Sequence, residues 1–327
     1  MENYLTQHIL YIVIGVAFFA YTFLYGPILG SGSVFPVIAK NDTERKAILH
    51  SVAPFWDGAG VWLIAAAVVM WGAFPQSYAT LFGGFFLALF IVLFFLLISI
   101  ASIELYLKDE KRKEMWKNAY FIGNLIPSLL FGVALGNVIM GIPLNEDLWY
   151  TGNFFTLLRP YALLVGLLGL SLLITHAMSY VLLKVSGDVV ERAKNVQKIS
   201  NSSFLLLFVI FVFWTHHMFK DLSIWYWVVA GIIVLLSVAI FFVKENHFWI
   251  STAMLLFSWA LVGLIQYPHI IRGLGEYSIT LFNNSSSALT QYAMIIILVI
   301  GLPFVIAYTY YSYFVFRGKF SGKEQMY

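Results

Sequence analysis

Two carboxylates lie close to long apolar segments of this chain, where a charged group is energetically costly. Asp57 stands between Trp56 and Trp62 at the start of one apolar run, and Glu104 lies near the end of the next run. Carboxylates inside apolar segments of this length commonly mark proton or ion pathways. We therefore predict a proton path through Asp57 and Glu104, with the two tryptophans as supporting residues.

A structural role is the alternative for each carboxylate. Asp57 could cap the N-terminus of its helix, because aspartate is among the preferred capping residues. Glu104 could instead extend to the polar boundary or pair with Lys108, four residues further along. The residues themselves leave these alternatives open.

Two asparagines lie in one glycine-rich apolar run. Asn124 and Asn137 share it with Pro127 and with Gly132 and Gly136, which are four residues apart. Small residues at this spacing let helix backbones approach closely, and buried amides then need partners inside the bundle or in another subunit. We expect a packing helix with both asparagines as supporting residues; contact with a quinone or a gating role is the alternative.

The histidines are candidates for haem ligation, and we expect none of them to serve in it. His176 lies inside an apolar run, whereas His216 and His217 are adjacent and point about 100° apart on a helix. We expect His176 to be a hydrogen-bonded core residue that supports the site. With no cysteine in the sequence, thiolate metal sites and disulfides are excluded. We expect no cofactor or metal ion in this chain.

The elements that position these residues must be membrane-spanning helices. Of 327 residues, 61% are hydrophobic and 11% charged, and the apolar residues fall in runs of about 20, enough to cross the bilayer core. We predict an all-α polytopic membrane protein with nine transmembrane helices, arranged as two four-helix bundles (spans 1–4 and 5–8) plus one peripheral helix. Residues 1–327 would form a single membrane domain. The nine runs are Ile9–Leu29, Val52–Phe74, Leu81–Tyr106, Ala119–Met140, Pro160–Leu183, Ser203–Phe219, Ser223–Val243, Phe248–Ile265 and Leu289–Phe316.

Short links predict which spans are neighbours. A tight turn at Pro75–Thr80 would make spans 2 and 3 antiparallel neighbours, and Lys220–Leu222 would do the same for spans 6 and 7. The first pairing would bring Asp57 and Glu104 to a similar depth. The stretch from Ser186 to Ser200 is typical of a short cytoplasmic amphipathic helix between spans 5 and 6.

The basic residues predict the orientation. With the N-terminus outside, 16 of the 19 Lys and Arg residues fall on the cytoplasmic side, and only Arg159, Lys220 and Arg272 fall outside. Positive charge concentrates on the cytoplasmic side of membrane proteins. We therefore predict an external N-terminus and a cytoplasmic C-terminus. The net charge of +3 follows from this topology, so we expect no nucleic-acid partner.

Four segments together resemble subunit II of the cytochrome bd quinol oxidases. The likeness covers about residues 20–195, and several ordered motifs recur at compatible spacing. The segments are NDTERKAILHSVAPFWDGAGVWLI, FPQSYATLFGGFFLALFIVL, FIGNLIPSLLFGVALGNVIMGIPL and TGNFFTLLRPYALLVGLLGLSLLITH.

The resemblance implies a hetero-oligomer in the inner membrane of a prokaryotic cell. Its partner, a membrane protein like subunit I, would hold two b-type haems and one d-type haem, and the complex would oxidise quinol and reduce dioxygen to water. Subunit II of this family binds no haem, supports its partner and supplies a cytoplasmic proton path, whose carboxylates correspond to Asp57 and Glu104. A bound quinone or lipid and a small single-helix subunit are further implied partners.

The chain also departs from the family pattern. Tyr25 and Ile28 stand where the family usually carries two aspartates, and Ala59-Gly60 and Ser99-Ile100 replace other polar positions. Either the proton route is changed, or the chain is a structural membrane subunit of a bd-like complex that lacks ordinary oxidase activity. We keep the second possibility as the alternative function.

Overall fold

The computed structural model describes residues 2–315 and residue 318, and it is built almost entirely from helices. Within the described residues, nine helical segments are long and apolar enough to cross a membrane. The prediction of a nine-span α-helical protein is therefore confirmed; Phe316, the predicted end of the ninth span, lies outside the described residues. The spanning helices are α1 (Glu2–Ser33), α4 (Trp56–Ala73), α6 (Phe86–Lys108), α7 (Lys113–Met140), α8 (Pro160–Lys184), α9 (Val189–Met218), α10 (Ile224–Phe242), α11 (His247–Gln266) and α12 (Ala288–Val315).

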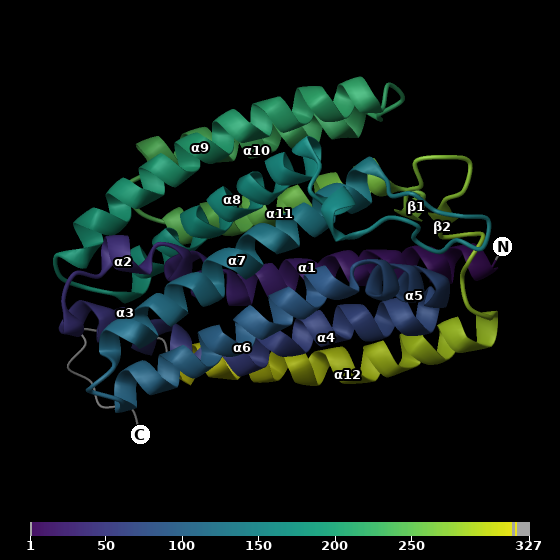
Figure 1. Cartoon of the computed structure of the whole chain (residues 1–327). Coiled ribbons are helices and arrows are strands. Elements are labelled where there is room, and N and C mark those ends of the chain that lie inside the picture. Colours follow the sequence, from purple (N-terminus) through teal and green to yellow (C-terminus); the bar gives the residue numbers. More distant parts are fainter. Residues whose placement is uncertain (1, 316–317, 319–327) are drawn as a thin grey trace.

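Short elements connect the long helices at both ends of the molecule (Figure 1). One end carries α2 and α3 together with the loops after α6 and α8; we call it the basic end. The other carries the start of α1, helix α5 and the antiparallel pair β1 and β2; we call it the hairpin end. The short elements are α2 (Phe35–Ile38), α3 (Asp42–Val52), the 3-10 turns η1 (Ala53–Phe55) and η2 (Phe154–Leu157), α5 (Pro75–Gly84), β1 (His269–Ile271) and β2 (Ile279–Thr280).

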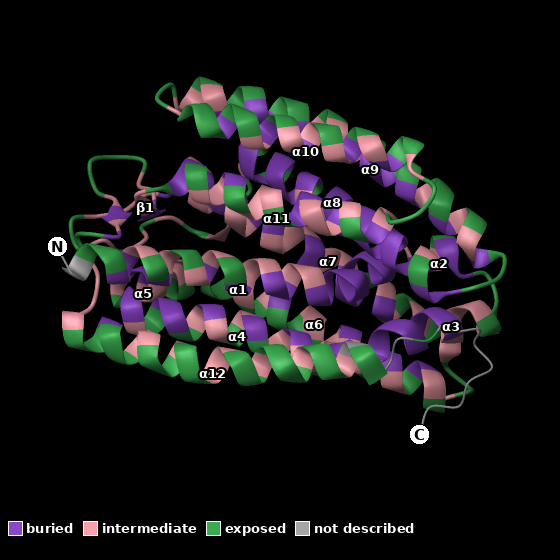
Figure 2. Ribbon diagram, turned by 180° about the vertical axis from the view of Figure 1, so that it is seen from behind, coloured by how far each residue is buried: buried purple, intermediate pink, exposed green. Residues whose placement is uncertain are grey.

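Helix α1 is the centre of the packing (Figure 1). It contacts α4, α7, α8, α11 and α12, while α6 packs on α7, α9 on α8 and α10 on α11. Since α1 joins helices from both halves of the chain, the division into two four-helix bundles remains a prediction. Helix α12 contacts α4 and α1 along one side and exposes most of its other residues (Figure 2).

Helices α7 and α8 pack through small residues. A Cβ atom added at Gly132 would lie 2.7 Å from the Gly166 Cα, and one added at Gly136 would lie 2.7 Å from the Ala162 Cα. Such backbone approach maximises van der Waals contact where lipid supplies no hydrophobic driving force. The predicted role of this glycine-rich run in close packing is thus observed.

The charged stretch before Asp57 forms helix α3, which runs through η1 into α4 almost without a break. The structure corrects two local predictions. The expected tight turn at Pro75–Thr80 is wrong, because these residues belong to the ten-residue helix α5. The segment Ser186–Ser200 is not a separate helix: from Val189 it forms the first part of α9 and continues directly into that span.

Helix α5 also changes which spans touch. Helix α4 makes its closest backbone contacts with α1, α5 and α12, whereas α6 makes them with α7 and α5. Spans 2 and 3 contribute side chains to the same core clusters, and their close pairing as antiparallel neighbours remains a prediction. Because proline begins α5 at Pro75, where its missing N–H is tolerated, the chain starts a new helix there and does not turn back directly.

Candidate functional site

Asp57 lies in the first turn of α4 at the basic end, and its side chain is exposed. The N-cap position is Phe55, with no side-chain cap, so the alternative in which Asp57 caps the helix is wrong. Among the described residues no side chain bonds or pairs with this carboxylate. The reason is that α3 and η1 lead into α4 with helical backbone, which leaves few free N–H groups to cap.

Glu104 lies one turn before the end of α6 and is half-buried. Its Oε2 atom is 2.9 Å from Lys108 Nζ, an ion pair between residues four apart on one helix. The alternative in which Glu104 pairs with Lys108 is therefore observed in the structure. Both carboxylates belong to the basic end, but no direct contact joins them within the described part of the chain.

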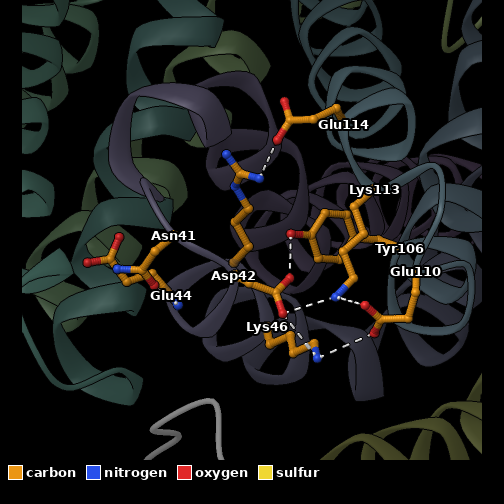
Figure 3. A network of polar contacts seen from close by, with 9 residues as sticks. Asn41, Asp42, Glu44, Lys46, Tyr106, Glu110, Lys113 and Glu114 are labelled. Atoms are coloured by element: carbon orange, nitrogen blue, oxygen red, sulfur yellow. Dashed lines mark hydrogen bonds and ion pairs between the residues drawn. The ribbon is translucent and has the colours of Figure 1, made fainter.

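A second set of charged residues at the basic end forms a connected network (Figure 3). Asp42 is its centre: Oδ1 accepts a hydrogen bond from the Tyr106 hydroxyl at 2.9 Å, and Oδ2 accepts from Lys113 Nζ at 3.0 Å. Lys46 Nζ lies 3.2 Å from the same oxygen. Glu110 Oε2 is 2.6 Å from Lys113 Nζ. The network thereby links α3, the end of α6 and the start of α7.

Two further ion pairs extend this network to other helices. Arg45 Nη1 is 2.6 Å from Glu114 Oε1 on α7, and Arg192 Nη2 on α9 is 2.5 Å from Glu44 Oε1. Arg192 Nε also donates to the Ile38 carbonyl at 2.9 Å. The Asn41 side chain caps α3 by accepting from the Glu44 N–H at 2.9 Å. These contacts hold α3 in place across the ends of three helices.

The sequence analysis missed this network. Its one local signal is the pattern of Asn41 followed three residues later by Glu44, which is typical of a helix start. The long-range partners, Tyr106, Lys113 and Arg192, carry no such signal because they lie 64 to 154 residues from their partners in the chain. In the adjoining loop, the indole N–H of Trp116 donates to Asp109 and lowers the pKa of that carboxyl.

Asn124 joins α1, α6 and α7. Its Oδ1 accepts from the Ser99 hydroxyl at 2.9 Å, and its Nδ2 donates to the Tyr120 carbonyl at 2.7 Å. The side chain lies against Gly32, where an added Cβ would come within 2.3 Å of Nδ2. The amide is fully buried and uses both of its polar atoms, so its geometry accounts for a packing role.

Asn137 serves the same purpose at the other end of α7. Its Nδ2 donates to the Val133 and Leu157 carbonyls at 2.9 and 2.7 Å. Its Oδ1 accepts from Arg159 Nη2 at 3.1 Å, and the same nitrogen donates to the Gly141 carbonyl at 2.6 Å. Burial lowers the pKa of the Arg159 guanidinium. The predicted supporting residue is therefore part of a structural link near the hairpin end.

His176 connects three helices in the core. Its Nε2 lies 3.1 Å from the Phe23 carbonyl of α1, and its Nδ1 lies 2.9 Å from the Ser251 hydroxyl of α11. A carbonyl only accepts, so Nε2 carries the proton and donates to Phe23. The Ser251 hydroxyl faces the unprotonated Nδ1 and also lies 2.9 Å from the Phe248 carbonyl, to which it can donate. Pro27 has no N–H and therefore leaves the Phe23 carbonyl, four residues earlier, without its helical donor. His176 supplies the missing hydrogen bond.

The two supporting tryptophans lie differently. Trp56 is half-buried and packs against the core cluster around α1, whereas Trp62 is 6% exposed within that cluster. The Nε1–H of Trp62 has no hydrogen-bond partner among the described residues. The hydroxyls of Tyr21 and Tyr25, in the same cluster, are also buried without such a partner. No feature of the sequence alone distinguishes these hydroxyls from tyrosine hydroxyls that form hydrogen bonds.

The other two haem-ligand candidates, His216 and His217, lie away from this region. His216 is near the end of α9, where its ring contacts Trp227 with centroids 5.0 Å apart, and His217 is exposed beside it. Within residues 2–315, no three His, Asp or Glu side chains come together as a metal-binding group.

A protein-family model matches most of the chain. Residues 6–316 match the model of the family described as cytochrome bd terminal oxidase subunit II. Similar proteins include the probable cytochrome oxidase subunit 2 of Haemophilus influenzae, 30% identical with 89% of each chain covered. The cytochrome bd ubiquinol oxidase subunit 2 of Bacillus subtilis is 29% identical, with 97% of each chain covered. Cytochrome bd-I ubiquinol oxidase subunit 2 of Escherichia coli is 26% identical over 97% of this chain and 96% of that protein.

A solved structure shows the same fold. A chain in the structure of bd oxidase from Geobacillus thermodenitrificans superposes with a TM-score of 0.76, although its sequence is only 19% identical. The superposition covers 95% of this chain and 98% of that one.

Proposed function

Because this chain belongs to the cytochrome bd terminal oxidase subunit II family, we propose that it supports a haem-bearing subunit I and carries protons to it from the cytoplasm through Asp57. As a family member it is a subunit of a cytochrome bd quinol oxidase complex, a multi-pass oxidoreductase of the prokaryotic membrane. In this proposal the b-type and d-type haems belong to the partner, and this chain holds no redox centre.

The observation that carries the proposal is the place of Asp57 on α4. Asp57 begins a stripe of exposed residues that continues with Val61, Ile64, Val68 and Trp71, at helical spacing along one face. An ionised carboxylate facing lipid tails is strongly disfavoured, whereas one facing a partner subunit or a hydrated path is not. The stripe therefore suits the partner subunit, and Asp57 would face it near the basic end.

Glu104 is the second station of the proposed path. Its side chain is 45% exposed at the basic end, and its ion pair with Lys108 ties it to a neighbouring cation. We expect it to contribute less than Asp57. The family's two helix-1 aspartates are replaced here by Tyr25 and Ile28, which keeps a structural subunit without ordinary oxidase activity as the second candidate. A bound quinone or lipid, and a small single-helix subunit, would be further components of the complex.

The proposal requires the basic end to face the cytoplasm. A reporter fused before Met1 is expected to be external and one fused after Tyr327 cytoplasmic, since positive residues are retained on the cytoplasmic side. Alkaline phosphatase and green fluorescent protein fusions measure the two locations. Two termini on the same side would contradict both the orientation and the cytoplasmic proton path.

Asp57→Asn in the assembled complex tests the proposal directly. Asparagine keeps the size and hydrogen bonding of aspartate but does not titrate. We expect normal assembly and haem content, with quinol-driven oxygen consumption reduced about tenfold or more, as for loss of a proton-transfer group. Glu104→Gln should reduce it less. An oxygen electrode with purified complex measures the rates.

Asp57→Ala is the matched control. Because Asp57 is not a cap, the complex with Asp57→Ala should also assemble. It should lose as much activity as the complex with Asp57→Asn. Loss of assembly in the alanine variant alone would assign Asp57 a structural role. Full turnover in the double variant Asp57→Asn, Glu104→Gln would mean that protons reach the partner by another route.

A further inference from the structure

Two buried tyrosines of α1 have hydroxyls without a hydrogen-bond partner in the described part of the chain. Tyr21 is 4% exposed and Tyr25 is 3% exposed, and neither hydroxyl forms a hydrogen bond with any described residue. Buried polar groups in proteins are nearly always hydrogen-bonded, to protein or to bound water. Two such groups next to one another, four residues apart on one helix face, therefore indicate a polar ligand between the helices.

The geometry of the two rings suits a small hydroxylic ligand. They are stacked, with centroids 5.3 Å apart and planes 14° apart, and Phe131 of α7 closes one side with its ring centroid 5.7 Å from that of Tyr21. Because the two residues lie on one face of α1 with their rings stacked, water bound beside them would supply the hydrogen bonds that no described residue provides.

Further hydroxyls continue from this point toward the basic end along the interface of α1 and α7. The Tyr120 hydroxyl lies 3.3 Å from Ser31 Oγ, and Ser33 Oγ lies 3.3 Å from Ser128 Oγ. All of these groups are buried. The row from Ser33 to Tyr21 extends about 18 Å along α1, at 1.5 Å per residue.

We propose that Tyr21 and Tyr25 line a buried water-binding site, and that this site and the hydroxyl row conduct protons from the basic end into the bundle. This inference rests on the proposed proton-supplying function and identifies a route for it inside the chain. Each hydroxyl or water accepts a proton on its oxygen and passes its own proton onward, so no group changes its net charge after transfer. Hydroxyls can do this because each is both donor and acceptor.

The test compares Tyr21→Phe and Tyr25→Phe in the assembled oxidase complex. Each change removes one hydroxyl and keeps the ring packing. We expect oxygen consumption to fall threefold or more for Tyr25→Phe, with a larger ratio of rates in H2O and D2O, and little change in melting temperature. Assembly is checked by haem content per complex, and a rate that falls only in proportion to lost complex counts against the proposal.

Tyr226→Phe is the matched control. Tyr226 is equally buried, but its hydroxyl donates to the Val212 carbonyl at 2.8 Å. This variant should melt at a lower temperature with unchanged turnover and isotope ratio. If Tyr21→Phe and Tyr25→Phe instead raise the melting temperature and leave turnover unchanged, the two hydroxyls bind no water and the proposal is wrong.

The outcome for Asp57→Asn separates this inference from the proposed function. Lower turnover in Asp57→Asn with normal turnover in both tyrosine variants would overturn the hydroxyl route alone. Lower turnover in Tyr25→Phe with normal turnover in Asp57→Asn would support the route and overturn the role of Asp57. Normal turnover in all three variants would overturn both.

Discussion

Gly30→Val is expected to prevent assembly of the complex or to lower its yield severely. A Cβ atom at Gly30 would lie 2.1 Å from the Leu173 carbonyl oxygen and 2.6 Å from the Ala177 Cβ. The first of these contacts is with backbone of α8, which cannot move aside as a flexible side chain would. Overpacking of a core commonly costs about 1–3 kcal/mol, and we expect more here because α1 is the central helix of the bundle.

Gly15→Val is the matched control for this prediction. Gly15 lies in the same helix, and among the described residues no heavy atom beyond its own stretch of helix lies within 4 Å of an added Cβ. Both variants introduce the same β-branched side chain, so the intrinsic helix preference changes equally. Yield of haem-loaded complex and its melting temperature are the measurements. Equal losses in the two variants would show that close approach of α1 and α8 is not the cause.

His176→Leu is expected to destabilise the protein by roughly 1–3 kcal/mol, the cost of losing a hydrogen bond to a buried group. The change removes the N–H that donates to the Phe23 carbonyl, whereas the Ser251 hydroxyl keeps its bond to the Phe248 carbonyl. Leucine is close to histidine in volume, so the loss comes mainly from hydrogen bonding. Thermal unfolding of the purified complex measures the change.

Pro27→Ala in the His176→Leu background tests the cause. Alanine restores an N–H at position 27, which can donate to the Phe23 carbonyl within α1 and replace the bond from His176. The double variant should therefore regain at least about 1 kcal/mol of stability relative to His176→Leu alone, a coupling that a double-mutant cycle isolates. Additive losses in the double variant would refute the assignment.

The candidate site was only partly predictable from sequence. Asp57 and Glu104 stand out locally, because a carboxylate beside a long apolar run is rare and has few explanations. Their surroundings do not follow from local pattern. The Lys108 partner of Glu104 lies within the same helix and was foreseen, whereas the contacts of Asp42 with Tyr106 and Lys113 join different helices and were not.

The sequence by itself determined the number of spanning helices, because transfer of an apolar run into lipid depends on its own residues and length. It likewise identified the glycine-rich α7 as a packing helix. Only the tertiary structure decided which helices touch. It placed helix α5 where a turn was expected, His176 beside the Phe23 carbonyl that Pro27 cannot reach with an N–H, and the hydroxyls of Tyr21 and Tyr25 away from any partner among the described residues. Side-chain partners depend on the rotation and position of each helix against its neighbours. In an apolar bundle the hydrophobic pattern specifies these only weakly, since lipid-facing and buried sides have similar composition.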